Sequence, residues 1–217
     1  MALKFTSTKG KAAKSVDALD VKDGDNVVRL VGGVLARYVY WLKTPDGKNI
    51  AIECLAFDRE QEKFDNRKED PVREVMPGQK CSWAYAVQCI INPNTDAAAI
   101  KTFNLKKKLF QQILTAAEDL GDPTDPETGW DVYFKKVKTG SHAFEVEYTL
   151  QVIKCGNAKR ALTDLERKLV SEMKSIDEVY PRPTVDQIKQ QLAALESSPA
   201  DDVPPEMGDG SSDDLPQ

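Results

Sequence analysis

The chain has 217 residues, of which 41% are hydrophobic and 30% are charged, and its formal net charge is −5. This length suits one domain of ordinary size with appendages, which can bury a core without needing a disulfide or a metal ion. No run of apolar residues approaches the roughly 18 needed for a membrane span, and the N-terminus lacks an apolar stretch of signal-peptide length, so we expect a cytoplasmic protein without a membrane partner.

The charges are distributed unevenly. No Lys or Arg follows Lys189, whereas seven acidic residues do, so removing these from the 35 acids leaves 28 against 30 basic residues in 1–189. A weakly basic body joined to an anionic tail is typical of a protein that binds nucleic acid and regulates that binding. The alternative is a tail that only keeps the protein soluble.

In chain order, residues 1–25 are predicted to form a basic flexible arm, since lysines alternate there with Ser, Thr, Gly and Ala. Segments rich in β-branched and aromatic residues then predict strands. The turn Thr44-Pro45-Asp46-Gly47 joins two of them as a hairpin. The predicted strands are 26–31, 34–43, 48–55, 82–91, 98–103, 130–138 and 143–153.

Between and after these strands, periodic apolar positions predict helices over 104–121, with Asn104 as N-cap, and over 158–178. Thr184 and Gln187 form a capping-box pattern that begins a further short helix. The highly charged segment 57–80 has few apolar positions and is predicted to be a solvated helix–loop excursion. From residue 197 to 217, Pro, Gly, Ser and Asp predict a disordered acidic tail.

Many short strands with one internal helix predict a mostly β fold with added helices, of the oligonucleotide-binding (OB) β-barrel type. We expect this domain over 26–156, C-terminal helices over 157–196, and the arm (1–25) and tail (197–217) on either side.

Signs of catalysis are missing from the sequence. It contains no phosphate-binding glycine loop, nucleophile elbow or recognisable acid–base pair, so we expect no enzyme and no cofactor. The four cysteines lack CxxC spacing and His142 is the single histidine, so they favour buried reduced thiols over a metal site.

Aromatic and basic residues alternate in a way that favours single-stranded nucleic acid, because unpaired bases stack on rings while cations contact phosphates. Arg37, Trp41 and Lys43 share one strand face, and Tyr38, Tyr40 and Leu42 on the other face are expected in the core. For Trp83 and Tyr85, burial is about as well supported as stacking.

Further candidates follow along the chain. Phe103 precedes three lysines at a helix start, where cations oppose the helix dipole and favour an anionic partner, although a plain solvated helix face explains them equally well. Phe144 and Tyr148 alternate with aliphatic residues, which favours the core. The remaining candidates in these segments are Lys106, Lys107, Lys108, Tyr133, Lys135, Lys136 and Lys138.

The order of several segments resembles the single-stranded DNA-binding (helix-destabilising) proteins of T-even-like bacteriophages. These segments are NVVRLVGG, WLKTPDGKNIAIEC, SWAYAVQCIINP, IKTFNLKKKLFQQI and GDPTDPETGWDVYFKKVKTG. The resemblance implies an OB fold with an aromatic and basic groove, in which Trp83, Phe103, Lys107 and Lys108 match groove positions and Phe144 and Tyr148 match them through gaps. It also implies no metal, because Trp41 stands where the family's type member has a histidine ligand for zinc.

The resemblance further implies self-association along DNA through the N-terminal arm, and contacts of the acidic tail with replication and recombination proteins. The function expected is therefore a non-catalytic protein that coats unwound DNA during replication, recombination and repair, in the host cytoplasm if a phage encodes the chain. Two alternatives stay open. One is an RNA-binding translational regulator on the same barrel, and the other is a scaffold protein in which the aromatics are all core.

Overall fold

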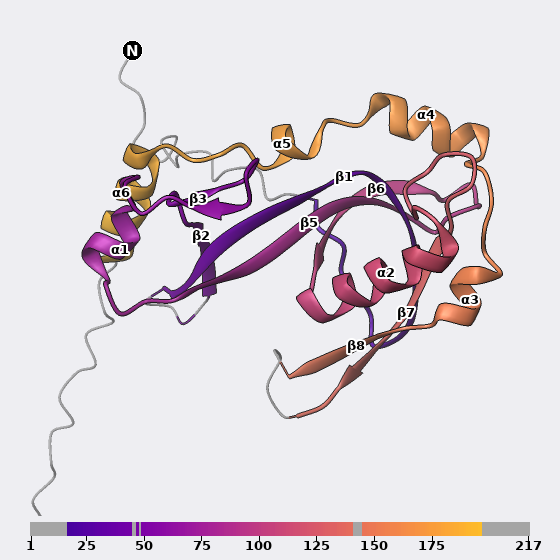
Figure 1. The fold of residues 1–217 in the computed structure, drawn as a ribbon, viewed down its shortest axis with the longest axis horizontal. Coiled ribbons are helices and arrows are strands. Elements are labelled where there is room, and N and C mark those ends of the chain that lie inside the picture. The colour runs from indigo at the N-terminus through magenta and orange to yellow at the C-terminus, as the bar shows by residue number, and fades with distance from the viewer. Residues whose placement is uncertain (1–16, 45–46, 48, 141–144, 197–217) are drawn as a thin grey trace, which may run out of the picture.

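The computed structural model describes residues 17–44, 47, 49–140 and 145–196. Its centre is a six-stranded antiparallel sheet with the order β6-β5-β1-β7-β8, in which β2 also pairs with β1 (Figure 1). The strands are β1 (Gly24–Lys43), β2 (Asn49–Glu53), β5 (Cys81–Ile91), β6 (Ala99–Leu105), β7 (Asp131–Lys138) and β8 (Val146–Leu150).

Strand β1 replaces the two strands expected over 26–31 and 34–43. Its pairing with β5 is interrupted between Val31 and Val34, where Gly32 adopts a φ of +69°. This glycine supplies a backbone conformation that other residues adopt at a cost, so the chain forms a bulge and continues as one strand. The first part of β1 pairs with β7 and the last part with β2, and β5 runs beside both parts (Figure 1).

Two lobes result from this long strand. The first lobe contains the first half of β1, the end of β5, β6, β7, β8 and helix α2 (Lys107–Leu120). The second lobe contains the end of β1, the start of β5, β2, the small sheet of β3 (Phe57–Asp58) and β4 (Lys63–Phe64), helix α1 (Pro71–Val75) and helix α6 (Val185–Glu196).

The first lobe has a continuous apolar core. Phe103 of β6 stacks on Phe134 of β7, with ring centroids 5.3 Å apart, and Leu109 and Ile113 of α2 pack against them. Trp130 is fully buried and donates its indole N–H to the carbonyl of Gly121, just past the end of α2. The expected antiparallel sheet with an internal helix is confirmed, whereas a closed barrel is not, since β6 and β8 remain edge strands within the described part of the chain.

The second lobe corrects the expectation for residues 57–80. This segment is not simply a solvated excursion, because it contributes buried apolar side chains: Phe57 contacts the rings of Tyr38 and Trp83, and Val72 packs with Ile188 of α6. Most of the charged residues around them stay at the surface, although Asp70 is buried, and this is why composition alone suggested solvation. The hairpin of β1 and β2 is confirmed by their pairing and by the Gly47 N–H, which donates to the Thr44 carbonyl at 2.9 Å.

The predicted helix over 158–178 is wrong as a single element. The chain forms α3 (Val152–Gly156), α4 (Asp164–Glu172) and α5 (Ile176–Val179), with capping boxes that begin α4 at Thr163 and α5 at Ser175. These two caps, each with Glu three residues later, divide the apolar periodicity into separate helices. The capping box before α6 is confirmed, since Thr184 and Gln187 exchange hydrogen bonds of 2.9 and 3.2 Å.

Helices α4 and α5 and the segment that leads to α6 run along the sheet as a strap (residues 162–184; Figure 1). Leu162 and Met173 pack on Val31 and Ile90, and Ile176 packs on Leu35 and Ala86. Within the predicted arm, residues 1–16 lie outside the described residues, whereas residues 17–23 lie against the sheet, where Ala18 forms a bridge with Thr102. None of the described helices has the length and apolar character to cross a membrane.

Candidate nucleic-acid interface

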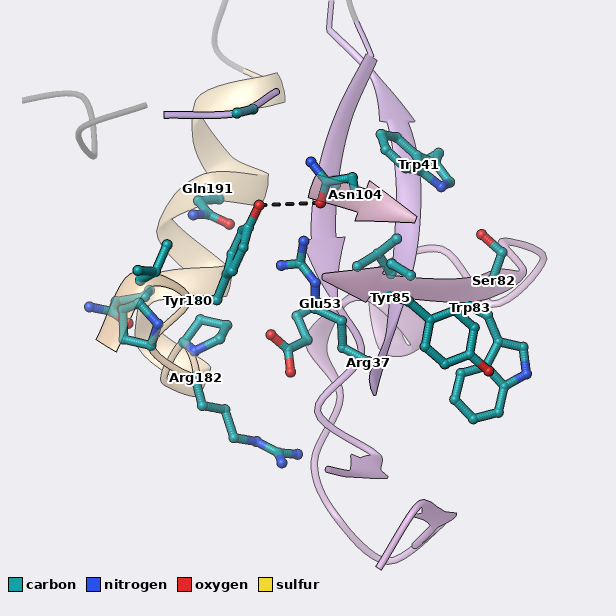
Figure 2. A pocket seen from close by; sticks show the side chains of 18 of the residues that line it. Arg37, Trp41, Glu53, Ser82, Trp83, Tyr85, Asn104, Tyr180, Arg182 and Gln191 are labelled. Carbon is teal, nitrogen blue, oxygen red and sulfur yellow. Dashed lines mark hydrogen bonds between the residues drawn. The ribbon is translucent and has the colours of Figure 1, made fainter. Parts of the chain in front are cut away.

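A cavity of about 1400 Å³ lies between the sheet and the strap, at the junction of the two lobes (Figure 2). Strands β1, β2, β5 and β6 contribute one wall, and residues 179–184 with one face of α6 contribute the other. The α6 face is uncharged and polar, since Gln187, Gln190 and Gln191 line it. A long, open, polar-edged cavity of this kind suits an extended ligand.

Six of the residues predicted to bind nucleic acid line this cavity, although they come from three separate segments of the sequence. They are Arg37, Trp41, Trp83, Tyr85, Lys106 and Lys107. The antiparallel register places Arg37 of β1 opposite Ala84 of β5, and Tyr85 opposite Leu105 at the end of β6. Because side chains alternate between the two faces of a sheet, Trp83 and Tyr85 border the cavity from strand β5 while their rings lie on the other face from Arg37.

Arg37 is the cation at the centre of the wall. Its guanidinium lies 4.0 Å from the centre of the Tyr180 ring, and it forms no ion pair with any described residue. Its Nε is buried without a hydrogen-bond partner. Burial lowers the pKa of Arg37 from its usual value, and the nearby Tyr180 and Glu53 oppose this effect. A guanidinium that borders a cavity and has no ion-pair partner among the described residues is suited to a phosphate oxygen.

The carboxylate that lines the cavity is already neutralised. Glu53 of β2 accepts two hydrogen bonds from Arg59, from Nε at 2.7 Å and from Nη2 at 2.6 Å. The third guanidinium nitrogen, Nη1, donates to the backbone carbonyl of Tyr180 at 2.9 Å. This bidentate pair removes the repulsion that a free carboxylate would exert on a polyanion and also attaches the strap to the second lobe.

The aromatic side chains differ in how much surface they offer. Trp41 is 53% exposed at the end of β1 and is available for stacking. Trp83 and Tyr85 are half-buried and stack on each other, with centroids 5.2 Å apart and planes inclined by 8° (Figure 2). They continue a row of rings, since Trp83 also contacts Tyr38 and Tyr85 contacts Phe110 of α2. Their rings point away from Tyr180, so only part of each borders the cavity (Figure 2).

Helix α2 brings positive charge to the cavity. Lys106 is its N-cap residue and Lys107 its first residue, both exposed, and its first turn contains no acidic side chain. Lys108 points elsewhere and forms an ion pair with Glu147 of β8. Unpaired lysines at a helix N-terminus are electrostatically unfavourable beside the dipole, and an anion there would relieve this repulsion.

Other predicted residues do not join the cavity. Phe103 is a core residue with 2% exposure, so the expectation that it stacks on bases does not fit its position. Tyr133 and Tyr148 are half-buried against the first-lobe core, and Lys136 donates to the Val21 carbonyl and pairs with Asp23. Lys43, Lys135 and Lys138 are exposed but do not line the cavity, and Phe144 lies outside the described residues.

Sequence reasoning missed the wall contributed by the strap. In sequence, Tyr180, Arg182 and the glutamines of α6 lie more than 70 residues from the lining residues of the strands and α2, and no binding role was predicted for them. The available signal was an aromatic residue followed by a cation between two prolines, in the segment Tyr180-Pro-Arg-Pro. Arg182 donates to the carbonyls of Leu55 and Phe57, at 2.8 and 2.6 Å, which fixes this segment to the second lobe.

Cys54 belongs to a buried polar group. Its thiol donates to Asp70 Oδ2 at 2.9 Å, and the Tyr40 hydroxyl donates to the same oxygen at 3.0 Å. Burial and the hydrogen bond to Asp70 raise the pKa of Cys54 to about 12. Within the described residues, no three His, Cys, Asp or Glu side chains gather as a metal site requires. This group links β1, the segment after β2 and the start of α1.

Comparison with known proteins gives one informative similarity. The chain is 27% identical over 226 residues to a protein named "Probable ssDNA-binding protein" of Escherichia phage T5, which covers 90% of this chain and 87% of that protein. No known protein-family profile matches the chain. The similarity supports the expected resemblance to phage single-stranded DNA-binding proteins without singling out the T-even type.

Proposed function

We propose that this protein binds single-stranded DNA in the cavity between the sheet and the strap, as a binding protein and not as an enzyme. The observation that carries the proposal is the convergence of Arg37, Trp41, Lys106 and Lys107 on one cavity whose only described carboxylate is paired with Arg59. The similarity to a phage protein named for this activity over nine-tenths of the chain supports the same conclusion.

In this proposal, bases stack on Trp41, while the positive charges of Arg37, Lys106 and Lys107 neutralise phosphates. Stacking contributes on the order of 1–3 kcal/mol per base and tolerates any base, so we expect weak sequence dependence. Helix α2 connects β6 to β7, which are the third and fourth strands in chain order of the path β6-β5-β1-β7-β8. This arrangement is consistent with the OB type of sheet, and we propose that type for this chain.

The decisive experiment is a fluorescence titration with oligo-dT at two salt concentrations. Stacking on Trp41 is expected to quench tryptophan emission, and binding is expected to weaken steeply with salt because counterions are released from the DNA. A Trp41→Phe variant is the control, since it retains a ring but removes the most exposed indole. Absence of binding to oligo-dT at low salt would refute the proposal.

DNA is preferred over RNA on the strength of the similarity alone, since stacking does not distinguish the two sugars. Competition between matched DNA and RNA oligomers tests this preference. If RNA of the same sequence competed better than DNA, the translational-regulator alternative would replace the present proposal.

We further propose roles in replication, recombination and repair, self-association through the N-terminal arm, and regulation by the acidic tail. Residues 197–217 lie outside the described residues, so the tail is argued from its charge. Deleting this tail is expected to tighten DNA binding, because a competing polyanion is removed. A full-length variant with the tail acids changed to Asn and Gln should bind as tightly as the deletion, and equal affinity of all three proteins at low salt would contradict this role.

A further inference from the structure

The contact between Arg37 and Tyr180 combines two interactions on one aromatic side chain. The planar guanidinium of Arg37 faces the Tyr180 ring at 4.0 Å, and the Tyr180 hydroxyl donates to Asn104 Oδ1 at 3.2 Å (Figure 2). The flat face of the Tyr180 ring is therefore stacked on a cation, and its hydroxyl is hydrogen-bonded to a side-chain amide. Unpaired bases are held in the same two ways by proteins that bind single strands.

The strap is held on both sides of Tyr180 by contacts that do not involve the Tyr180 ring. Ile176 packs on Leu35 and Ala86 on one side of it, and Arg182 is bonded to the Leu55 and Phe57 carbonyls on the other. The backbone carbonyl of Tyr180 is held separately by Arg59. The backbone is thus fixed on both sides of the residue, while the ring itself is half-buried and borders the open cavity.

We propose that Arg37 and Asn104 form a nucleobase subsite, and that Tyr180 occupies it in the DNA-free protein as a substitute for the base. An incoming unpaired base displaces the Tyr180 ring, stacks on the Arg37 guanidinium and places its polar edge at Asn104. This inference rests on the proposed function, since it assigns one position in the same cavity and explains how the protein guards it.

If the base displaces the Tyr180 ring, removing that ring by mutation should raise the affinity for DNA and not lower it. A ring that only lines the cavity would contribute to binding, so its removal would weaken the complex. A ring that competes with the base lowers the apparent affinity by the fraction of molecules in which the subsite is closed, so its removal tightens the complex. From the strength of a partly exposed cation–π contact, we expect Tyr180→Ala to bind oligo-dT about three- to tenfold more tightly.

The experiment measures oligo-dT affinity by fluorescence anisotropy for the wild type, Tyr180→Ala, Arg37→Lys and the double variant. Tyr180→Leu keeps apolar packing on Leu35 and Ala86 without a π face, so it provides the same test if the alanine variant is unstable. Arg37→Lys keeps the charge but loses the plane, so it should bind severalfold less tightly with an unchanged salt slope. Ile153→Ala, at an 83% exposed position of α3 that does not line the cavity, is the control for a surface substitution.

The expected result is that removing the Tyr180 ring tightens binding in the wild-type background and has no such effect in the Arg37→Lys background. If removal weakens binding or leaves it unchanged while the wild type still binds, the subsite proposal fails and DNA binding itself stands. If the wild type does not bind oligo-dT, the proposed function fails and the subsite proposal fails with it.

Discussion

Within each of the two lobes, a different set of contacts stabilises the fold. The first lobe has one apolar core, in which Phe103, Trp130 and Phe134 pack with the apolar face of α2. The second lobe has a smaller core and is fastened by polar side chains, including the bonds of Tyr40 and Cys54 to Asp70 and of Arg182 to two backbone carbonyls. The cavity lies where the two lobes meet. The comparison teaches that burial, more than residue type, separates aromatics that stabilise the fold from those available to a ligand.

The largest expected effect separates these two classes of aromatic residue. Phe103→Ala removes a ring that is 2% exposed in the first-lobe core, so it should lower the free energy of unfolding by about 3–5 kcal/mol. Trp41→Ala, at a 53% exposed position, should change stability by about 0.5 kcal/mol or less. Urea unfolding of both variants measures this difference.

Affinity for oligo-dT should show the reverse order. Trp41→Ala is expected to weaken binding by about 1–3 kcal/mol, whereas the folded fraction of Phe103→Ala should bind as the wild type does. If Phe103→Ala remained fully stable and lost DNA binding, the division between core and cavity aromatics would be wrong.

The next effect concerns the anchor of the strap on the first lobe. Glu166 is fully buried at the start of α4, where it accepts two hydrogen bonds from Arg160 and one each from the backbone N–H groups of Asn94 and Thr163. Burial alone would raise the pKa of Glu166, but these hydrogen bonds and the Arg160 charge outweigh it and lower the pKa to about 2. The ionised carboxylate therefore stabilises the folded state.

Because the folded pKa of Glu166 lies below the ordinary value of 4.5, its contribution is complete above about pH 4.5 and is lost as the pH falls toward 2. Glu166→Gln should lower the free energy of unfolding by about 1–3 kcal/mol at pH 7 and by less at pH 3. Urea unfolding at both pH values provides the measurement. A loss of equal size at both would show that the charge of Glu166 is not what holds the strap.

The sequence alone predicted more of the first lobe than of the second. The bounds of strands β5, β6 and β7 were predicted within about two residues, because long runs of β-branched and aromatic residues indicate a strand without information from the rest of the chain. The segment 57–80 was misjudged because few of its side chains are buried, and the partners of Phe57 and Val72 come from the distant elements β1, β5 and α6. The wall of the cavity that the strap contributes was missed for the same reason. The contact that suggests a role for Tyr180 is with Arg37, which is 143 positions away in the sequence.

A smaller effect tests the ion pair of Arg59 with Glu53, which lies in the second lobe beside the cavity. Arg59→Met leaves Glu53 as an unpaired carboxylate beside the bound DNA, so binding of oligo-dT should weaken by roughly three- to tenfold through charge repulsion. Glu53→Gln in the same chain removes the repelling charge and should restore most of the affinity. Fluorescence anisotropy of the single and double variants measures it. If the double variant bound no better than Arg59→Met, the role of Arg59 would be to hold the Tyr180 backbone and not to neutralise Glu53.

The smallest effect lies at the first-lobe side of the cavity and distinguishes its lysines from one another. Lys106 and Lys107 border the cavity without a carboxylate partner among the described residues, whereas Lys108 is paired with Glu147. Each phosphate contact to a single strand contributes about 0.7 to the slope of log affinity against log salt, so Lys106→Ala and Lys107→Ala should each lower the slope by about that amount. Lys108→Ala is the matched control, one position further along α2, and should leave the slope unchanged. Equal slopes for all three variants would mean that the strand does not pass the start of α2, and its path would then have to lie along Arg37 and Trp41 alone.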